Sequence, residues 1–166
     1  LGYYSRARNM HYTSRIIVNQ YNGIFPATYN DIIKLKGIGP YTAAAILSFA
    51  FGQAYPVMDG NVIRVLSRLF GIDVPIDISP GLNLLKEKLY LIFDSINPAD
   101  FNQAIMEFGA THCQQRKPAC NNCFAASYCL GYQHNIVNML PVKSKKIVTR
   151  QRYFMYFVPL MTINGA

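Results

Sequence analysis

The sequence predicts an all-α fold, and three observations lead to this expectation. Apolar residues recur at helical spacing in the stretches 5–20 and 59–69. Ser79-Pro80 and Asn97-Pro98 each pair a capping residue with a proline suited to a first helical turn. Strand-like sequence is almost absent before position 150 and then appears in the aromatic run 152–158. We therefore expect a helical core, a cysteine-rich loop, a linker and the start of a β-containing domain.

The first expected helix runs from Ser5 to Gln20, and Gly23 is its stop signal. Met10, Ile16 and Ile17 would form its apolar side. Three arginines would occupy its polar positions: Arg6, Arg8 and Arg15.

Residues 29–52 predict two helices joined by a glycine-rich turn. Thr28 and Asp31 resemble a capping box, with Asp in place of Glu, that opens a short helix ending at Leu35. The run Gly37-Ile38-Gly39 allows a tight turn and a close backbone approach, and Pro40 suits the start of the next helix. The amides left free at this turn and helix start form a small anion site suited to a phosphate. A Gly-x-Gly turn is common, so its meaning depends on its context.

The next expected helix follows Asp59, with Arg64 and Arg68 on a different side from its apolar residues. Taken alone, Asp59 reads equally well as a plain N-cap. The two cap–proline pairs then start helices near 80–95 and 98–111.

Composition favours a folded, nucleic-acid-binding protein. The chain has 166 residues, 51% of them hydrophobic, which is enough for one good core. Sixteen Lys and Arg against eight Asp and Glu give a net charge of +8. The pI of about 9.4 lies in the range of nucleic-acid binders, although a basic chain can also simply be soluble. No apolar run reaches membrane-spanning length, so we expect no membrane contact.

All four cysteines fall within seventeen residues, in the pattern C-x6-C-x2-C-x5-C, which indicates one shared site. They are Cys113, Cys120, Cys123 and Cys129. A single close pair with looser outer ligands suits an iron–sulphur cluster. Four-thiolate zinc remains an alternative, although zinc ribbons use two close pairs, and disulfides would need an oxidising compartment.

Arg116 and Lys117 lie in the first intercysteine loop, where they could contact a DNA backbone or only offset the cluster's charge. No metal-ligand spacing involves the histidines: His11, His112 and His134.

Three motifs in this order resemble endonuclease III-type DNA glycosylases: the helix-hairpin-helix 35–43, the aspartate in 57–62 and the cysteine loop. The stretches 1–9 and 59–66 resemble the adenine-excising MutY branch in particular. The resemblance covers residues 1 to about 135 and implies a 4Fe–4S cluster on the four cysteines. It also implies that the chain is a fragment that lacks the N-terminus and most of a C-terminal domain.

The resemblance divides the chain into four parts. Residues 1–111 would be the helical glycosylase core without its N-terminal helices, and 112–135 the cluster loop region. Residues 136–152 would be a basic interdomain linker, and 153–166 the first strand of a truncated C-terminal domain.

One position separates the branches of this family. Members that also cleave the DNA backbone carry a lysine after the hairpin, which forms a Schiff base with the sugar. This chain has Tyr41 there, which favours the adenine-specific branch without lyase activity. The implied reaction is hydrolysis of the N-glycosidic bond of adenine opposite 8-oxoguanine or guanine, after base flipping. Asp59 matches the carboxylate that supports the oxocarbenium-like sugar, and Asn61 and Tyr41 match positions at the same pocket.

Double-stranded DNA with A:8-oxoguanine or A:G mispairs is the implied partner of a monomeric, nucleoid-associated protein of the bacterial cytoplasm. Tyr3 matches the tyrosine that wedges beside the oxidised guanine; without the resemblance it could be a buried ring at a helix start. The hairpin would contact DNA through Lys36, Gly37, Ile38, Gly39 and Tyr41.

The family's general acid is a glutamate in an N-terminal helix, and no residue here matches it. Glu87 and Glu107 fit solvated helix positions instead. We therefore expect this fragment to be inactive alone. Two other functions stay open: an endonuclease III-like glycosylase and lyase on oxidised pyrimidines, and a non-catalytic DNA-binding iron–sulphur module. A zinc-ribbon adaptor is a third alternative.

Overall fold

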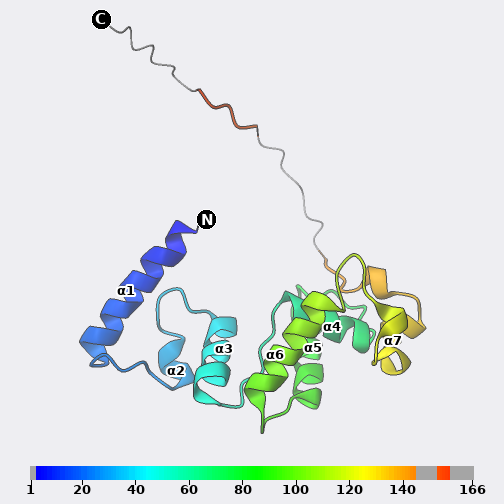
Figure 1. The fold of residues 1–166 in the computed structure, drawn as a ribbon, viewed down its shortest axis with the longest axis horizontal. Coiled ribbons are helices and arrows are strands. Elements are labelled where there is room, and N and C mark those ends of the chain that lie inside the picture. The colour runs from blue at the N-terminus through cyan, green and yellow to red at the C-terminus, as the bar shows by residue number, and fades with distance from the viewer. Residues whose placement is uncertain (1–2, 145–152, 158–166) are drawn as a thin grey trace, which may run out of the picture.

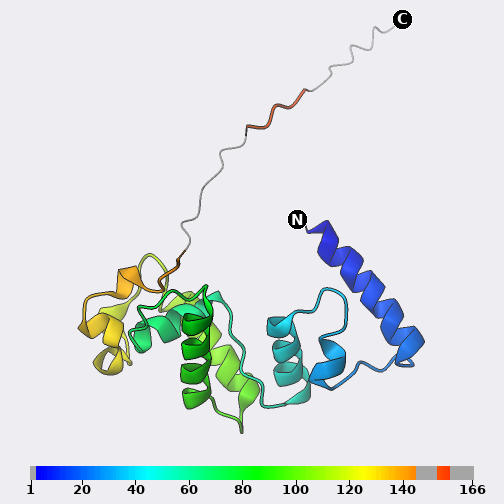
Figure 2. The same ribbon diagram turned by 180° about the vertical axis from the view of Figure 1, so that it is seen from behind.

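The computed structural model describes residues 3–144 and 153–157, and every regular element in these ranges is helical (Figures 1 and 2). The all-α expectation is confirmed for these residues. The α-helices are α1 (Tyr4–Gln20), α2 (Tyr29–Ile32), α3 (Pro40–Phe51), α4 (Gly60–Leu69), α5 (Ser79–Ile92), α6 (Pro98–Thr111) and α7 (Leu130–Gln133). The short 3-10 helices are η1 (Cys120–Asn122), η2 (Ala126–Tyr128) and η3 (Val137–Met139).

The first helix, α1, begins one residue before the predicted start and ends at Gln20 as predicted. Ile16 and Ile17, expected on its apolar side, are half-buried. Met10, expected on the apolar side, is 66% exposed, so that assignment was wrong. Thr13 is the buried residue of this helix, and its hydroxyl donates to the carbonyl of Lys36 over 2.9 Å. The helix thus packs on the glycine-rich turn through small polar side chains, which hydrophobic periodicity does not reveal.

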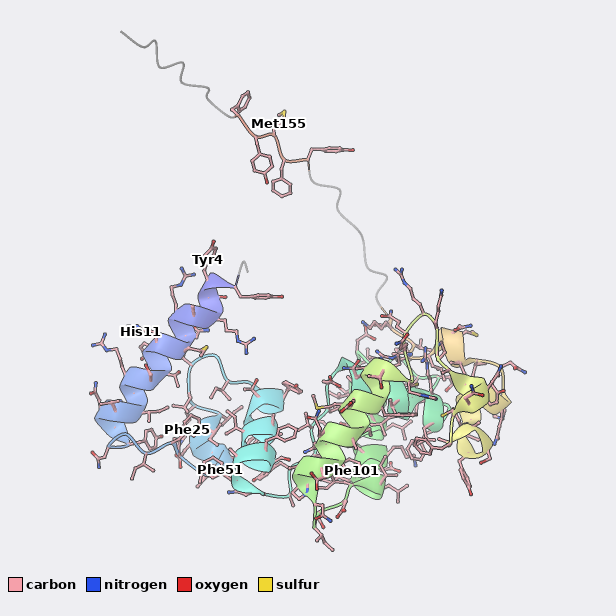
Figure 3. All side chains as sticks on the ribbon, viewed as in Figure 1. Tyr4, His11, Phe25, Phe51, Phe101 and Met155 are labelled. Atoms are coloured by element: carbon pink, nitrogen blue, oxygen red, sulfur yellow. The ribbon has the colours of Figure 1, made fainter. Side chains whose placement is uncertain are left out.

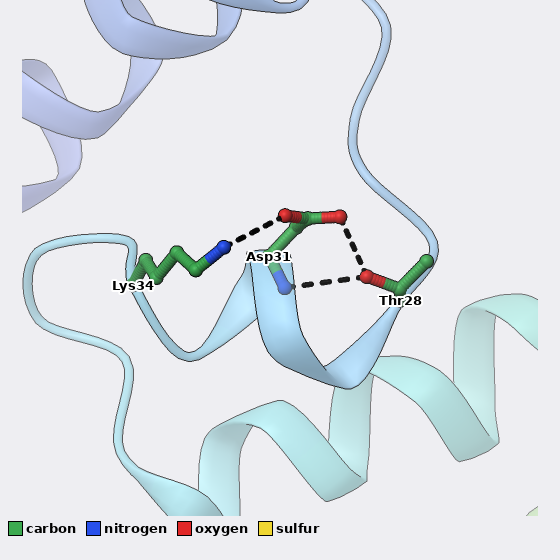
Figure 4. Close-up of polar contacts among 3 residues, drawn as sticks. All are labelled: Thr28, Asp31 and Lys34. Atoms are coloured by element: carbon green, nitrogen blue, oxygen red, sulfur yellow. Dashed lines mark hydrogen bonds and ion pairs between the residues drawn. The ribbon is translucent and has the colours of Figure 1, made fainter.

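Capping starts α2 as predicted (Figure 4). It differs from a capping box in one respect, because the Asp31 carboxylate pairs with the Thr28 side chain and not with the Thr28 backbone. The hydroxyl of Thr28 accepts from the Asp31 amide and donates to the Asp31 carboxylate over 2.6 Å. These bonds, with Lys34 at 3.2 Å, lower the pKa of Asp31. The helix ends at Ile32 rather than at Leu35, because the Leu35 amide bonds the Ile32 carbonyl and tightens the chain into turns.

Two hydrophobic clusters form the core. The smaller one joins α2 and α3, and its buried residues are Ile32, Ala43 and Leu47. The larger one joins α4, α5 and α6, and its buried residues are Val62, Val65, Leu66, Ile72, Leu85, Leu89 and Ile105. Figure 1 shows the corresponding two groups of helices, with α3 and α6 as neighbours where the groups meet.

Asn102, fully buried on α6, bonds the two groups together. Its amide nitrogen donates to the Ser48 hydroxyl on α3 over 2.7 Å and to the Tyr55 carbonyl over 2.9 Å. Its amide oxygen accepts from the Val57 amide over 2.9 Å. The segment that leads to Asp59 is therefore anchored just before it enters α4.

Two predicted caps differ from the structure. Ile78 is the N-cap of α5, and Ser79 is the first helical residue. Asn97 is the N-cap of α6, but its side chain donates to the Asp94 carboxylate instead of capping the helix. A proline needs no amide partner in the first turn of a helix. In the sequence, the starts of α5 and α6 are therefore indicated by Pro80 and Pro98, and neither helix has a side-chain cap.

The chain after the cysteines returns to the loop before α5. The Ile76 amide donates to the Val142 carbonyl over 3.0 Å, and Ser144 donates to the Asp77 carboxylate from both its amide and its hydroxyl. Residues 153–157 have no regular structure, and their side chains, Met155 among them, are exposed (Figure 3). The rest of the predicted strand and the linker residues 145–152 lie outside the described residues. Within the described part, no helix is long and apolar enough to cross a bilayer.

Candidate active site and cysteine cavity

The hairpin, residues 35–40, presents backbone to solvent. Gly37 adopts a φ of +88°, and a Cβ there would lie 2.8 Å from the Cβ of Asn9 on α1. Both reasons exclude a side chain at this position. Gly39 is the exposed N-cap of α3, and the amides of Tyr41 and Thr42 in the first turn have no intrahelical partner. The turn therefore leaves these amides free, and a phosphate bound to them stays a prediction.

Asp59 holds a half-buried carboxylate at the N-terminus of α4. One oxygen accepts from the Val62 amide over 2.8 Å, which is N-capping. The other oxygen accepts from the Asn61 side-chain amide over 2.9 Å. Asp59 is therefore a cap, and it is also a carboxylate whose orientation is fixed by a neighbouring side chain.

Arg64, one turn further along α4, holds the opposite end of Asn61. Its guanidinium donates to the Asn61 side-chain oxygen over 2.9 Å and to the Cys113 carbonyl over 2.8 Å. It also donates to the Gly109 carbonyl on α6. The carboxylate of Asp59 is thereby linked through Asn61 and Arg64 to the backbone of the first cysteine.

Gly109 allows this arrangement because α6 crosses α4 at very close range. A Cβ at position 109 would lie 2.8 Å from the Asn61 Cβ and 3.0 Å from the Asn61 carbonyl. Gly109 is fully buried in this contact. A glycine at this crossing therefore sets the distance of α6 from the residue that orients Asp59.

The four cysteines line one cavity of about 340 Å³ between α4, α6 and the loop that carries η1 and η2. All four are partly buried and none forms a disulfide. Burial and the neighbouring cysteines raise the pKa of the Cys120 thiol, and burial is also the main cause of the raised pKa of Cys129. Thiols with these pKa values need a cation before they can be thiolates at neutral pH.

Arg68, which we expected on the polar side of α4, is instead only 2% exposed at the wall of this cavity. Its guanidinium donates to four backbone carbonyls and to one sulfur. The acceptors are the carbonyls of Val137, Cys113, Gln114 and Gln115 and the Sγ of Cys113, at 2.8 to 3.3 Å. No carboxylate pairs with Arg68 among the described residues.

Four cysteines beside a buried arginine are a donor set that suits an iron–sulphur cluster. Among the described residues, no three Cys, His, Asp or Glu side chains converge on one metal position. A buried cation needs nearby negative charge, which four cluster-bound thiolates would give to Arg68. In addition, the buried Nε2 of His112 at this cavity has no hydrogen-bond partner.

The remaining predicted site residues are exposed. Tyr3 is the N-cap of α1 and 74% exposed, so the buried-ring alternative is wrong. Tyr41 lies in the first turn of α3 at 44% exposure, and within the described part no hydrogen bond joins it to Asp59. Arg116 and Lys117 lie exposed in the first intercysteine loop.

Comparisons with known proteins agree on one family. Residues 20–49 match the helix-hairpin-helix motif. The chain is 39% identical over 160 residues to the adenine DNA glycosylase of Buchnera aphidicola subsp. Baizongia pistaciae, covering 93% of the chain and 44% of that relative. It is 42% identical over 138 residues to the human adenine DNA glycosylase, covering 80% and 24%. The chain belongs to the adenine DNA glycosylase branch of the helix-hairpin-helix glycosylases.

Solved structures of the wider family share the fold. An endonuclease III–DNA complex superposes with a TM-score of 0.68 at 29% identity, over 81% of the chain and 62% of that protein. A thermostable thymine-DNA glycosylase gives 0.70 at 31% identity, over 78% and 59%. The chain spans less than half the length of these adenine DNA glycosylase relatives.

Sequence reasoning missed Arg64, Arg68 and Gly109. Both arginines looked like the polar face of a helix, since nothing in the spacing of α4 shows that backbone carbonyls surround them. Four cysteines in one loop were the one signal that could have suggested a buried counter-cation such as Arg68. Gly109 lies in a regular helical pattern, and nothing in that pattern indicates its close contact with Asn61.

Proposed function

We propose that the protein to which this chain belongs hydrolyses the N-glycosidic bond of adenine in mispaired DNA. The observation that carries the proposal is the carboxylate of Asp59, fixed by Asn61 and Val62 at a helix N-terminus. Its support is the identity of 39% and 40% to two adenine DNA glycosylases, over 93% and 99% of the chain.

The arrangement suits stabilisation of a cationic sugar. A glycosidic bond breaks through an oxocarbenium-like transition state, which a correctly placed carboxylate stabilises. The hydrogen bonds from Asn61 and Val62 hold this carboxylate in one rotamer at the helix N-terminus. The same reaction also needs a general acid that protonates the departing base.

Recognition of the mispair would begin on the opposite strand. Tyr3 projects from the start of α1 and is free to stack between bases beside 8-oxoguanine or guanine. The hairpin amides and Lys36 would hold a phosphate, and Arg116 and Lys117 would contact the backbone from the cysteine loop. With DNA as substrate, the protein would act at the chromosome.

Tyr41 supports a hydrolase without lyase activity. Lyases of this superfamily use a lysine amine to attack the sugar, and a phenol cannot form that Schiff base. Lys36, the nearest lysine in sequence, lies over the Tyr12 ring at 5.0 Å on the other side of the hairpin turn.

A 4Fe–4S cluster is the cofactor that we assign to the cysteine cavity. Cys113, Cys120, Cys123 and Cys129 would hold it, and Arg68 and His112 would donate to its sulfurs. The cluster would fix the loop that carries Arg116 and Lys117. Metal and sulfide analysis of the purified protein tests this assignment, because zinc without sulfide would overturn it.

The activity is tested by single-turnover excision with the full-length protein. Duplexes that contain A:8-oxoguanine, A:G or A:T would be compared with a duplex that carries an oxidised pyrimidine. We expect adenine release from the two mispairs and no adduct after borohydride reduction. Release of the oxidised pyrimidine, or a trapped protein–DNA adduct, would instead support the glycosylase–lyase alternative.

A further inference from the structure

A basic groove lies beside the hairpin, and neither the catalytic carboxylate nor the cysteine cavity uses it. Its volume is about 650 Å³, and residues of α1 and Lys36 line it. Nitrogen-tipped side chains extend from α1 in Figure 3, where His11 is labelled. The lining residues are Ser5, Arg8, Asn9, His11, Tyr12, Arg15, Ile16, Asn19 and Lys36. We call this site the α1 groove.

The polar lining follows a regular helical stripe. Ser5, Arg8, Tyr12, Arg15 and Asn19 are spaced by three and four residues, so they share one face of α1. This stripe lies next to the face that packs on the hairpin through Thr13. All five residues are exposed, so the stripe faces solvent.

The positive charge of the α1 groove is uncompensated. No Asp or Glu lines it, and α1 contains none. The ion pairs within the described residues are Lys34–Asp31 and Lys88–Glu87, so Arg8, Arg15 and Lys36 have no acidic partner there. Lys36 is held by its cation–π contact with Tyr12 rather than by a carboxylate.

The size and shape of the α1 groove favour an extended polyanion. Arg8 and Arg15 are seven residues apart, which is about 10 Å along a helix. That span exceeds what one small anion can bridge and suits neighbouring phosphates of a nucleic-acid strand. Lys36 joins this stripe to the hairpin amides, so a strand held at the hairpin could continue along α1.

We propose that the α1 groove is a second DNA-backbone site, in which Arg8 and Arg15 bind phosphates beyond those held by the hairpin. This inference rests on the proposed function, since it extends the footprint of the same DNA. Because each arginine would displace a counterion, both contribute to the salt dependence of binding.

The test is the salt dependence of duplex binding by the full-length protein, measured by fluorescence anisotropy. Arg8→Gln and Arg15→Gln should each reduce the slope of log affinity against log salt by about 1, and together by about 2. Lys86→Gln on α5 is the charge-matched control, because Lys86 is exposed and outside the groove. Arg15→Lys keeps the charge and should retain the slope.

Three results distinguish a failure of the α1 groove from a failure of the proposed function. Slopes of the Arg8 and Arg15 variants equal to that of the unmodified protein would overturn the α1 groove and leave the proposed function intact. An equal loss in Lys86→Gln would also overturn it, because the effect would then be one of net charge. If the unmodified protein did not bind duplex DNA at all, the proposed function itself would be contradicted.

Discussion

Asn61 donates a hydrogen bond to Asp59 over 2.9 Å and accepts one from Arg64 over 2.9 Å, so both ends of its side-chain amide are held. The bond from Arg64 identifies the oxygen end of this amide, and the nitrogen end must then face the carboxylate. The orientation of Asp59 thus depends on a residue, Arg64, that also bonds the backbone of Cys113. The carboxylate and the cysteine loop share one hydrogen-bonded frame.

Gly109→Ala tests whether the close crossing of α4 and α6 keeps Asn61 in place to orient the Asp59 carboxylate. The added Cβ would press on Asn61, and overpacking of this kind costs about 1–3 kcal/mol. We expect a lower melting temperature and a slower single-turnover rate, with duplex affinity unchanged. Gly60→Ala is the matched control for stability, since a Cβ there meets open space. A melting temperature and rate equal to those of the unmodified protein would contradict a positioning role for Gly109.

Arg68→Met tests the role of the buried guanidinium. The carbonyls of Gln114 and Gln115 would lose their donor, at about 1–3 kcal/mol for each one left unsatisfied. The Cys113 carbonyl would keep Arg64 as a donor, and the Val137 carbonyl would keep the Leu140 amide. The variant should lose about 3–5 kcal/mol of unfolding free energy and part of the iron of the proposed cluster. Arg116→Met, the same change at an exposed position, should stay within about 0.5 kcal/mol. Equal unfolding free energies for the two variants would show that Arg68 does not organise the cavity.

Much of this architecture could be predicted because it depends on local rules. Pro40, Pro98 and Thr28 mark helix starts through backbone chemistry that acts within one turn. The turn at Gly37–Gly39 and the shared cavity of the four cysteines follow from short-range spacing in the same way.

The rest could not be predicted, because it depends on contacts between distant segments. The sequence predicts a surface position for Arg68, but the loop at 113–115 and Val137 cover it and accept its hydrogen bonds. The sequence predicts a core position for Met10, but Met10 is exposed and Thr13 contacts the hairpin instead. Asn102, polar in an apolar helix, gave no sign that it joins the two groups of helices.

Asn102→Ala tests that junction. The substitution removes hydrogen bonds to the Val57 amide, the Ser48 hydroxyl and the Tyr55 carbonyl, all at buried or partly buried positions. We expect a loss of about 2–4 kcal/mol in urea unfolding, from unsatisfied groups and lost volume. Asn83→Ala on the exposed face of α5 is the control and should change stability by about 0.5 kcal/mol or less. Similar urea midpoints for both variants would show that α3 and α6 are held together by other contacts.

Asp59 has the central role in the proposed reaction, as the carboxylate that stabilises the reacting sugar. The direct measurement is single-turnover excision of adenine from an A:8-oxoguanine duplex by the full-length protein and its Asp59→Asn variant. The variant keeps the size of the side chain and an oxygen to cap Val62, but its NH2 then faces the Asn61 nitrogen and loses that hydrogen bond. Its melting temperature and duplex affinity are therefore measured beside the rate, and both should stay close to those of the unmodified protein. We expect the excision rate to fall by about a hundredfold or more, as for loss of one preorganised electrostatic contact. An unchanged rate in a variant that still binds the duplex would contradict the assignment of Asp59.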